Sequence, residues 1–158
     1  MKRNVNLLHL SRDHHHGLLL GWKIRQGLKY LTLPETVAEY VDYFSREALF
    51  PHFQEEEQTI LIYLQADDAF RLRTINEHTQ IENAIHALLK SKDKSAAVLI
   101  KVADMLDAHI RFEERELFPY IENLLSDEQL EEIGKNLDDN HQPFTDNFSN
   151  EFWREHAH

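Results

Sequence analysis

The chain has 158 residues, 42% of them hydrophobic, which suits one compact domain spanning residues 1–158. Seventeen basic against 28 acidic residues give a formal net charge of −11, which argues against nucleic acid or an anionic membrane as a partner. The absence of cysteine excludes disulfides and thiolate metal sites, so any metal would be held by imidazole and carboxylate groups. The apolar runs are too short for a signal peptide or a membrane span, so we expect a soluble cytoplasmic protein.

The first half of the chain predicts two helices. Only four glycines and four prolines interrupt a pattern of apolar residues at three- and four-residue spacing, which predicts an all-α fold. A first helix is expected to begin with Ser11 as its N-cap. A second, long helix is expected over residues 33–65, with Pro34 in its first turn. Pro51 lies inside this second helix, so we expect a kink just before His52.

The second half of the chain predicts three more helices. A third helix is expected over residues 68–90 and a fourth over residues 96–125, with a short polar connection between them. Ser126 and Gln129 fit a capping box at the start of a short fifth helix. Because short connections force neighbouring helices to run antiparallel, the four long helices should pack as an up-down-up-down four-helix bundle.

The bundle should occupy about residues 10–125, and a C-terminal helix and tail should occupy residues 126–158. We expect the tail histidines, His141, His156 and His158, to be solvated or structural rather than metal ligands. The aromatic residues of the tail predict a packed segment rather than disorder, and they are Phe144, Phe148, Phe152 and Trp153.

Two segments repeat the order histidine, three residues, then two glutamates: "HFQEEE" from residue 52 and "HIRFEE" from residue 109. On a helix, positions i and i+4 lie on the same face, about one turn apart. His52 with Glu56, and His109 with Glu113, can therefore each direct both side chains at one point.

Two further histidines follow an acidic residue, Asp13 before His14 and Glu77 before His78. The chain thus resembles a weak two-fold repeat, in which an acid–histidine helix precedes a histidine–glutamate helix. His14 is favoured on the first helix because small glycines on its face leave room for a site, and His15 is the alternative.

These residue types suit a pair of metal ions. Imidazole nitrogens bind iron, manganese or zinc terminally, whereas a carboxylate can bridge two ions that lie about 3.5–4 Å apart. Glu56 and Glu113 would be the bridges. Two cations would also remove the desolvation cost of placing carboxylates in an apolar bundle. Few protein ligands would leave coordination positions open for a small molecule.

The ordered motifs "DHHHGL", "HFQEEE", "EHTQI" and "HIRFEERELFP" resemble those of the hemerythrin-like, HHE cation-binding proteins. The resemblance implies a four-helix bundle that holds a non-haem di-iron centre, bridged also by an oxo or hydroxo group, although other divalent metals are possible. It implies that His14 and His52 bind one iron, and that His78 and His109 bind the other. Glu56 and Glu113 would bridge the two irons.

The chain departs from the oxygen-carrying hemerythrins at two places. These carriers have a second histidine four residues after the one on the third helix, where this chain has Glu82, which could be a ligand or an outer residue. They also place the last carboxylate five residues after its histidine, which would select Glu114. We favour Glu113 because helical geometry and the match to Glu56 agree. The neighbouring glutamates are expected to be solvated, with Glu55 the best candidate for an outer residue.

The leading hypothesis is a di-iron protein that binds oxygen, nitric oxide or peroxide for sensing, storage or protection. A second hypothesis is a di-iron oxidoreductase or a repair protein that handles nitric oxide, with Glu82 as an additional ligand. A third is a metal-free helical interaction module, in which the histidines and glutamates would face solvent. No catalytic acid, base or nucleophile outside the metal site is identified, and oligomerisation is possible but not predicted.

Overall fold

The computed structural model describes residues 2–155, and it contains helices but no strand within that range. His156 and His158 lie outside the described residues. In chain order, the α-helices are α1 (Leu8–Lys29), α2 (Pro34–Phe44), α3 (Phe50–Thr59), α4 (Ala69–Lys90), α5 (Ala96–Phe112), α6 (Phe118–Leu124) and α7 (Asp127–Asn140). The short helical turns between or before them are η1 (Val5–Leu7), η2 (Ser45–Leu49), η3 (Leu61–Tyr63) and η4 (Glu113–Leu117).

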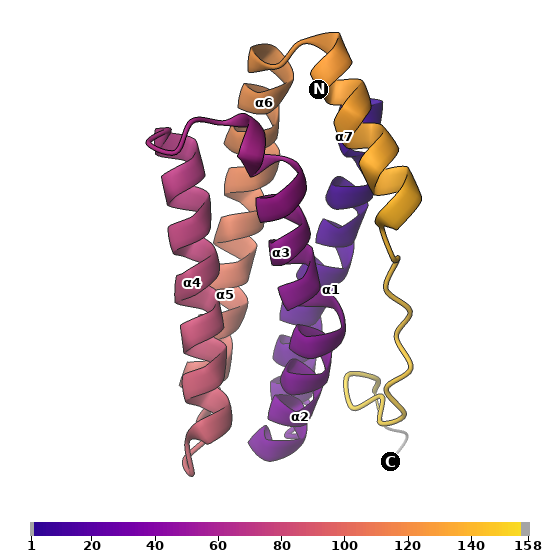
Figure 1. The fold of residues 1–158 in the computed structure, drawn as a ribbon. Coiled ribbons are helices and arrows are strands. Elements are labelled where there is room, and N and C mark those ends of the chain that lie inside the picture. The colour runs from indigo at the N-terminus through magenta and orange to yellow at the C-terminus, as the bar shows by residue number, and fades with distance from the viewer. Residues whose placement is uncertain (1, 156–158) are drawn as a thin grey trace.

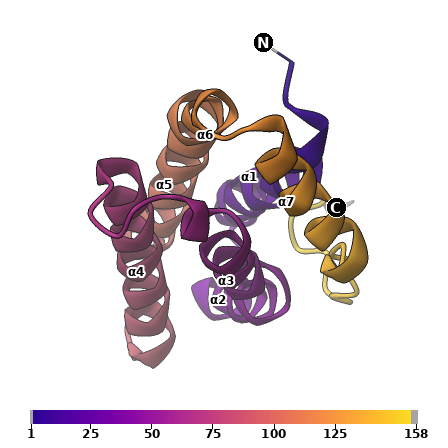
Figure 2. The same cartoon turned by 45° about the horizontal axis from the view of Figure 1, so that its top comes forward.

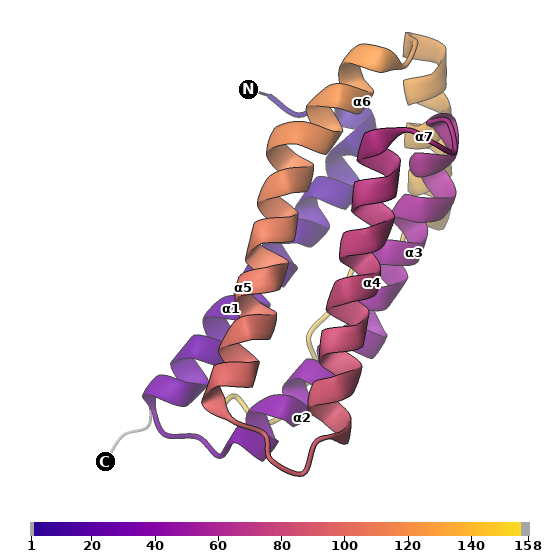
Figure 3. The same ribbon diagram turned by 90° about the vertical axis from the view of Figure 1, so that its left-hand side faces the viewer.

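The fold is an all-α bundle of four long antiparallel rods. The π-helical turn η2 joins α2 to α3, and the π-helical turn η4 joins α5 to α6, so each pair forms one continuous rod. These two rods lie side by side with α1 and α4 in alternating directions (Figures 1 and 3). Helix α7 packs on the outside of the bundle against η1 and α3, as Figure 2 shows. The predicted all-α, up-down-up-down architecture is confirmed.

The helix boundaries follow the sequence closely, with one exception at the N-terminus. Asp68 and Ser95 are the N-caps of α4 and α5, and Ser126 and Gln129 form the predicted capping box of α7. Ser11, however, is not an N-cap, because α1 already begins at Leu8. The helix extends upstream because Leu7 and Leu10 are fully buried, in the same core cluster as Ile121 and Leu125.

Both π-helical turns lie just before a proline. Pro51 and Pro119 are each the second residue of the α-helix that resumes after η2 or η4. A proline in a helix interior has no N–H to donate and its ring clashes with the carbonyl four residues earlier. A wider turn relieves that clash, and such turns often occur at functional sites. A π-helical turn therefore lies just before His52, at the place where the sequence predicts a kink.

Two apolar cores fill the bundle, and a polar layer separates them. One core contains Leu20, Ile24 and Phe53, and the other contains Leu10, Ile60 and Phe112. On α1, the layer lies between Leu10 and Leu20, and on α3 its two members, His52 and Glu56, lie on either side of Phe53 in the sequence. The side chains in this layer are buried by apolar packing above and below them.

The C-terminal tail is packed against the bundle, as its aromatic residues predicted. It descends along the outside of the bundle after α7 (Figure 1). Phe152 is 1% exposed and joins the core, while Asp146 accepts hydrogen bonds from Lys23 at 2.7 Å and Tyr40 at 2.6 Å. The Lys23 ammonium lies 4.1 Å from the centre of the Trp153 ring, a favourable cation–π arrangement.

Within residues 2–155, none of the helices combines the length and the apolar character that crossing a membrane would require.

The two leucines Leu18 and Leu20 of α1 provide a direct test of this packing. Leu20 is fully buried and Leu18 is 45% exposed. We expect Leu20→Ala to lower the free energy of unfolding by about 2–5 kcal/mol, since it leaves a cavity. The same change at Leu18 should cost about 0.5 kcal/mol or less. Urea denaturation followed by circular dichroism measures both, and equal effects would contradict this description of α1.

Candidate metal centre

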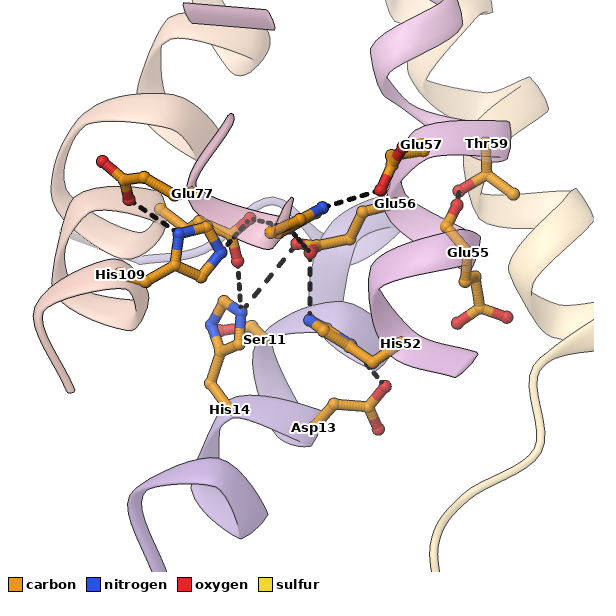
Figure 4. A network of polar contacts seen from close by, with 12 residues as sticks. Ser11, Asp13, His14, His52, Glu55, Glu56, Glu57, Thr59, Glu77 and His109 are labelled. Atoms are coloured by element: carbon orange, nitrogen blue, oxygen red, sulfur yellow. Dashed lines mark hydrogen bonds and ion pairs between the residues drawn. The ribbon is translucent and has the colours of Figure 1, made fainter. Parts of the chain in front are cut away.

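The polar layer consists of four histidines and two glutamates, one or two from each rod of the bundle. His14 comes from α1, His52 and Glu56 from α3, and His78 from α4. His109 lies in the last turn of α5, and Glu113 begins η4. Both glutamates are fully buried and the histidines are between 1% and 7% exposed. Figure 4 shows His14, His52, Glu56 and His109 converging between the rods.

These six side chains form two groups that share both glutamates. His14, His52, Glu56 and Glu113 place one potential ligand atom each within 4.8 Å of one another. Glu56, His78, His109 and Glu113 do the same. Two histidines and two shared carboxylates for each of two positions is the arrangement expected for a dinuclear metal centre with carboxylate bridges.

The shared carboxylates face the Nε2 atoms of all four histidines. Glu56 Oε1 lies 3.3 Å from His52 Nε2 and 3.2 Å from His78 Nε2. The two oxygens of Glu113 lie 2.8 Å from His14 Nε2 and 3.2 Å from His109 Nε2. Each glutamate thus contacts one histidine from each of the two groups, as a bridge requires.

A second set of four carboxylates, the outer carboxylates, holds the other side of each imidazole. Each outer carboxylate accepts a hydrogen bond from one histidine Nδ1, at 2.8–2.9 Å. These bonds fix which nitrogen carries the proton and aim the Nε2 lone pair at the centre. The pairs are Asp13 with His52, Glu57 with His78, Glu77 with His109, and Glu114 with His14.

The four outer hydrogen bonds close a ring around the bundle. Helix α1 supplies the carboxylate for α3, α3 supplies it for α4, and α4 supplies it for α5. The turn η4 supplies it for α1. Asp13 and Glu77 therefore do not act on the histidines that follow them in sequence, but on those of the neighbouring rod.

The π-helical turn η4 explains how two consecutive glutamates serve the same histidine. Glu113 approaches His14 Nε2, while Glu114 accepts from His14 Nδ1 at 2.9 Å and from Ser11 Oγ at 2.7 Å. Of these two glutamates, Glu113 belongs to both groups at the centre, and Glu114 lies outside them.

The nitrogen and oxygen atoms of this layer fit the binding of a pair of metal ions. Several buried polar atoms at the centre have no hydrogen-bond partner, and they are Nε2 of His52, His78 and His109, both oxygens of Glu56, and Oε2 of Glu113. Buried polar groups are almost always satisfied, so a cluster of unpartnered donor atoms directed at one place fits the binding of a cation there. Nitrogen and oxygen donors without sulfur suit iron, manganese or zinc.

The electrostatics of the centre agree with a cation site. Burial raises the pKa of Glu113, but the charge of His109 and the proximity of the other histidines outweigh burial and hold it well below its usual value. Burial lowers the pKa of His78, but the carboxylates of Glu113, Glu56 and Glu57 around its ring raise it to about 11. Without a metal ion, protons on the imidazoles balance the carboxylates; a metal ion would take over that role.

A pocket of about 230 Å³ reaches the centre from the surface. Glu47 and Gln142 stand at its outer end, and His14, His52 and His109 at its inner end. Its walls are mostly apolar, and they include Phe44, Leu49, Phe53, Leu106, Ile110 and Phe144. A small molecule could reach the side of the centre that His14 and His52 line.

Two residues considered from the sequence lie elsewhere. His15 is exposed on the outer face of α1, one position away from the buried His14. Glu82 is half-buried on α4, and it belongs to neither group at the centre. Conversely, Glu57 and Glu114 are expected from the sequence to be solvated, but they accept hydrogen bonds from His78 and His14, respectively. Their only sequence signal is adjacency to the central glutamates.

His141 is a further residue that the sequence did not single out for this site. It follows α7, and its ring lies between Asp13 and Glu55, with which it forms a third group of potential ligand atoms. A lone histidine at the end of an amphipathic helix carries no local signal of such a contact.

Fold and site together define a class: a four-helix bundle with a buried histidine–carboxylate cluster suited to metal binding. The model of the hemerythrin HHE cation-binding domain matches residues 6–121, so the chain belongs to this family. The match covers all six central residues and ends within α6, before α7 and the tail. No curated protein and no solved structure matches the chain.

The outer carboxylates can be tested by two substitutions on α4. We expect Glu77→Gln to weaken metal binding about 10–100-fold, because the amide no longer holds His109 as an anionic acceptor. Glu82→Gln, five residues along the same helix, should leave metal binding unchanged. Competition with a chromophoric chelator measures both affinities, and an equal loss in the two variants would contradict the assignment of Glu77.

Metal binding should release protons, because imidazole must be neutral to coordinate a metal. The pKa of His109, lowered by burial but raised by the charge of Glu113, is about 9 without metal, so this imidazole is protonated at neutral pH. Because protons compete with the metal for the imidazole, the apparent metal affinity should rise as the pH increases toward 9. Calorimetric titration with Zn²⁺ in two buffers of different ionisation enthalpy measures the released protons, and identical heats would contradict it.

Proposed function

We propose that this chain holds a dinuclear non-haem iron centre and binds a small ligand there, namely oxygen, nitric oxide or peroxide. His14 and His52 would bind one iron, His78 and His109 the other, and Glu56 and Glu113 would bridge them. The iron pair would supply the open coordination positions at which the small ligand binds. Sensing, storage or protection are the roles that such binding serves.

The observation that carries the proposal is the sharing of Glu56 and Glu113 between two histidine pairs. A single metal site would need only one histidine pair, and a buried hydrogen-bonded network would leave few polar atoms unpartnered. Here each carboxylate contacts a histidine from both pairs, and the outer carboxylates orient all four rings.

The pocket gives a small ligand access to the proposed centre. At about 230 Å³ it has room for oxygen, nitric oxide or peroxide, and part of its lining is apolar, including Phe44, Phe53 and Phe144. Helix α7 and the tail contribute Asn140, His141, Gln142 and Phe144 to the same lining.

The two competing hypotheses receive less support. The hypothesis of an oxidoreductase or a nitric oxide repair protein includes Glu82 as an additional ligand. This side chain lies outside both groups of potential metal ligands at the centre. A metal-free interaction module was expected to turn its histidines and glutamates to solvent, whereas the six central side chains are at most 7% exposed. Neither hypothesis has a specific observation in its favour.

The first experiment is the metal content of the untagged protein, purified without added metal, by inductively coupled plasma mass spectrometry. We expect close to two irons per chain. His109→Ala should reduce this to one or none and lower the melting temperature, since bound metal stabilises the folded state. The exposed His86 provides the matched control, and His86→Ala should keep both irons.

Full loading and an unchanged melting temperature in His109→Ala would contradict the ligand set. Zinc in place of iron would keep the ligand set and remove the redox role. No metal in the purified protein, and none taken up after anaerobic addition of ferrous iron, would leave the metal-free module as the better hypothesis. Optical titration with azide, nitric oxide and peroxide then identifies the ligand.

A further inference from the structure

His141 extends the hydrogen-bonded network of the metal centre into the C-terminal part of the chain. It caps the end of α7, and its side chain is only 6% exposed. Its Nδ1 lies 2.5 Å from Glu55 Oε1, and its Nε2 lies 3.2 Å from Asp13 Oδ1. One imidazole therefore connects α7 to both α3 and α1, at a position outside the matched family domain.

Asp13 is the connection to the metal centre. Its Oδ1 faces His141, and its Oδ2 accepts the hydrogen bond from His52 Nδ1 at 2.9 Å. We propose that His141 is a positioning residue for His52, acting through Asp13, so that α7 and the tail are part of the metal centre. The inference rests on the dinuclear centre proposed above.

Two of the other three outer carboxylates, Glu77 and Glu114, show what such a second partner does. Glu77 also pairs with Arg73 at 2.8 Å, and Glu114 also accepts from Ser11. Each of these carboxylates is thus held on both sides, which fixes the direction in which it presents an oxygen to its histidine. His141 is the residue that holds Asp13 in the same way.

The C-terminal segment is anchored firmly enough to hold His141 in place. The His9 and His141 rings lie 5.0 Å apart between their centres, and His9 also binds Asp138 of α7. Further along the tail, Asp146 accepts from the buried Lys23, and Phe152 fills the core. Docking of this segment and the position of Asp13 are therefore coupled.

Asp13, Glu55 and His141 could alternatively hold a third metal ion, since their potential ligand atoms fall within 4.8 Å of one another. The geometry favours direct contacts between the side chains, because the two carboxylates face different nitrogens of the same ring: Glu55 shares a hydrogen bond with Nδ1, and Asp13 lies 3.2 Å from Nε2. A metal ion could use only one of these nitrogens, and Asp13 already binds His52.

The test is a double-mutant cycle with Co²⁺ as the probe, because its absorption spectrum reports the ligand field. Stepwise Co²⁺ affinities are measured by chelator competition for the full chain, His141→Ala, Asp13→Asn and the double variant. We expect His141→Ala to weaken one of the two binding steps about tenfold, the low end for loss of an outer partner, and to shift the cobalt spectrum. In the Asp13→Asn variant, adding His141→Ala should cause almost no further loss of Co²⁺ affinity.

Two further variants separate positioning from a structural role. His16 lines the same pocket and packs edge-on against Phe144 of the tail, without a hydrogen bond to an outer carboxylate. His16→Ala should therefore leave both affinities and the spectrum unchanged. His141→Gln keeps an N–H donor for Asp13 and should restore most of the affinity. Circular dichroism and thermal melting of each variant establish that the fold is retained.

Four outcomes overturn the inference. Unchanged affinity and spectrum in His141→Ala, with two Co²⁺ bound, would reject it while leaving the dinuclear centre intact. Additive losses in the double variant would mean that His141 does not act through Asp13. Three bound Co²⁺ in the full chain, with one lost in His141→Ala, would make the group a metal site. Absence of Co²⁺ binding in the full chain would reject the centre itself.

Discussion

Two glutamates with no exposure to solvent impose the constraint around which this protein is organised. Removing Glu56 and Glu113 from water costs several kcal/mol each unless opposite charge compensates them. The chain surrounds these two carboxylates with four imidazoles, whose protons can balance the two negative charges and whose nitrogens would coordinate the proposed metal ions. The position of the bundle's polar layer, between two apolar cores, follows from this requirement.

The ring of outer hydrogen bonds also determines which helices are neighbours in the bundle. Each hydrogen bond joins neighbouring rods, so exchanging two rods would leave a histidine without its acceptor. Buried polar groups that are satisfied in only one arrangement favour that arrangement over alternatives of similar apolar packing. The same bonds direct Nε2 of every histidine inward, which means that folding and preparation of the metal site are one process.

The sequence predicted what depends on local periodicity. Helix positions, the capping box at Ser126 and the i, i+4 pairs follow from spacing alone, and so did the choice of His14 over His15 as the buried residue. Contacts between rods could not be predicted in this way. Asp13 precedes His14 in the chain but binds His52, because adjacent helical residues point in different directions. The start of α1 also differed, since burial of Leu7 outweighed the local preference of Ser11 for an N-cap.

Residues 126–155 lie outside the matched family domain but contribute to the same pocket and polar network. Most of the pocket lining and all four outer hydrogen bonds arise within the matched domain, whereas Asn140, His141, Gln142 and Phe144 add to the lining from α7 and the tail. His141 also contacts Asp13, the acceptor of the hydrogen bond from His52. Residues outside the matched domain thus touch both the pocket and an outer carboxylate, so substitutions in them would act on both at once.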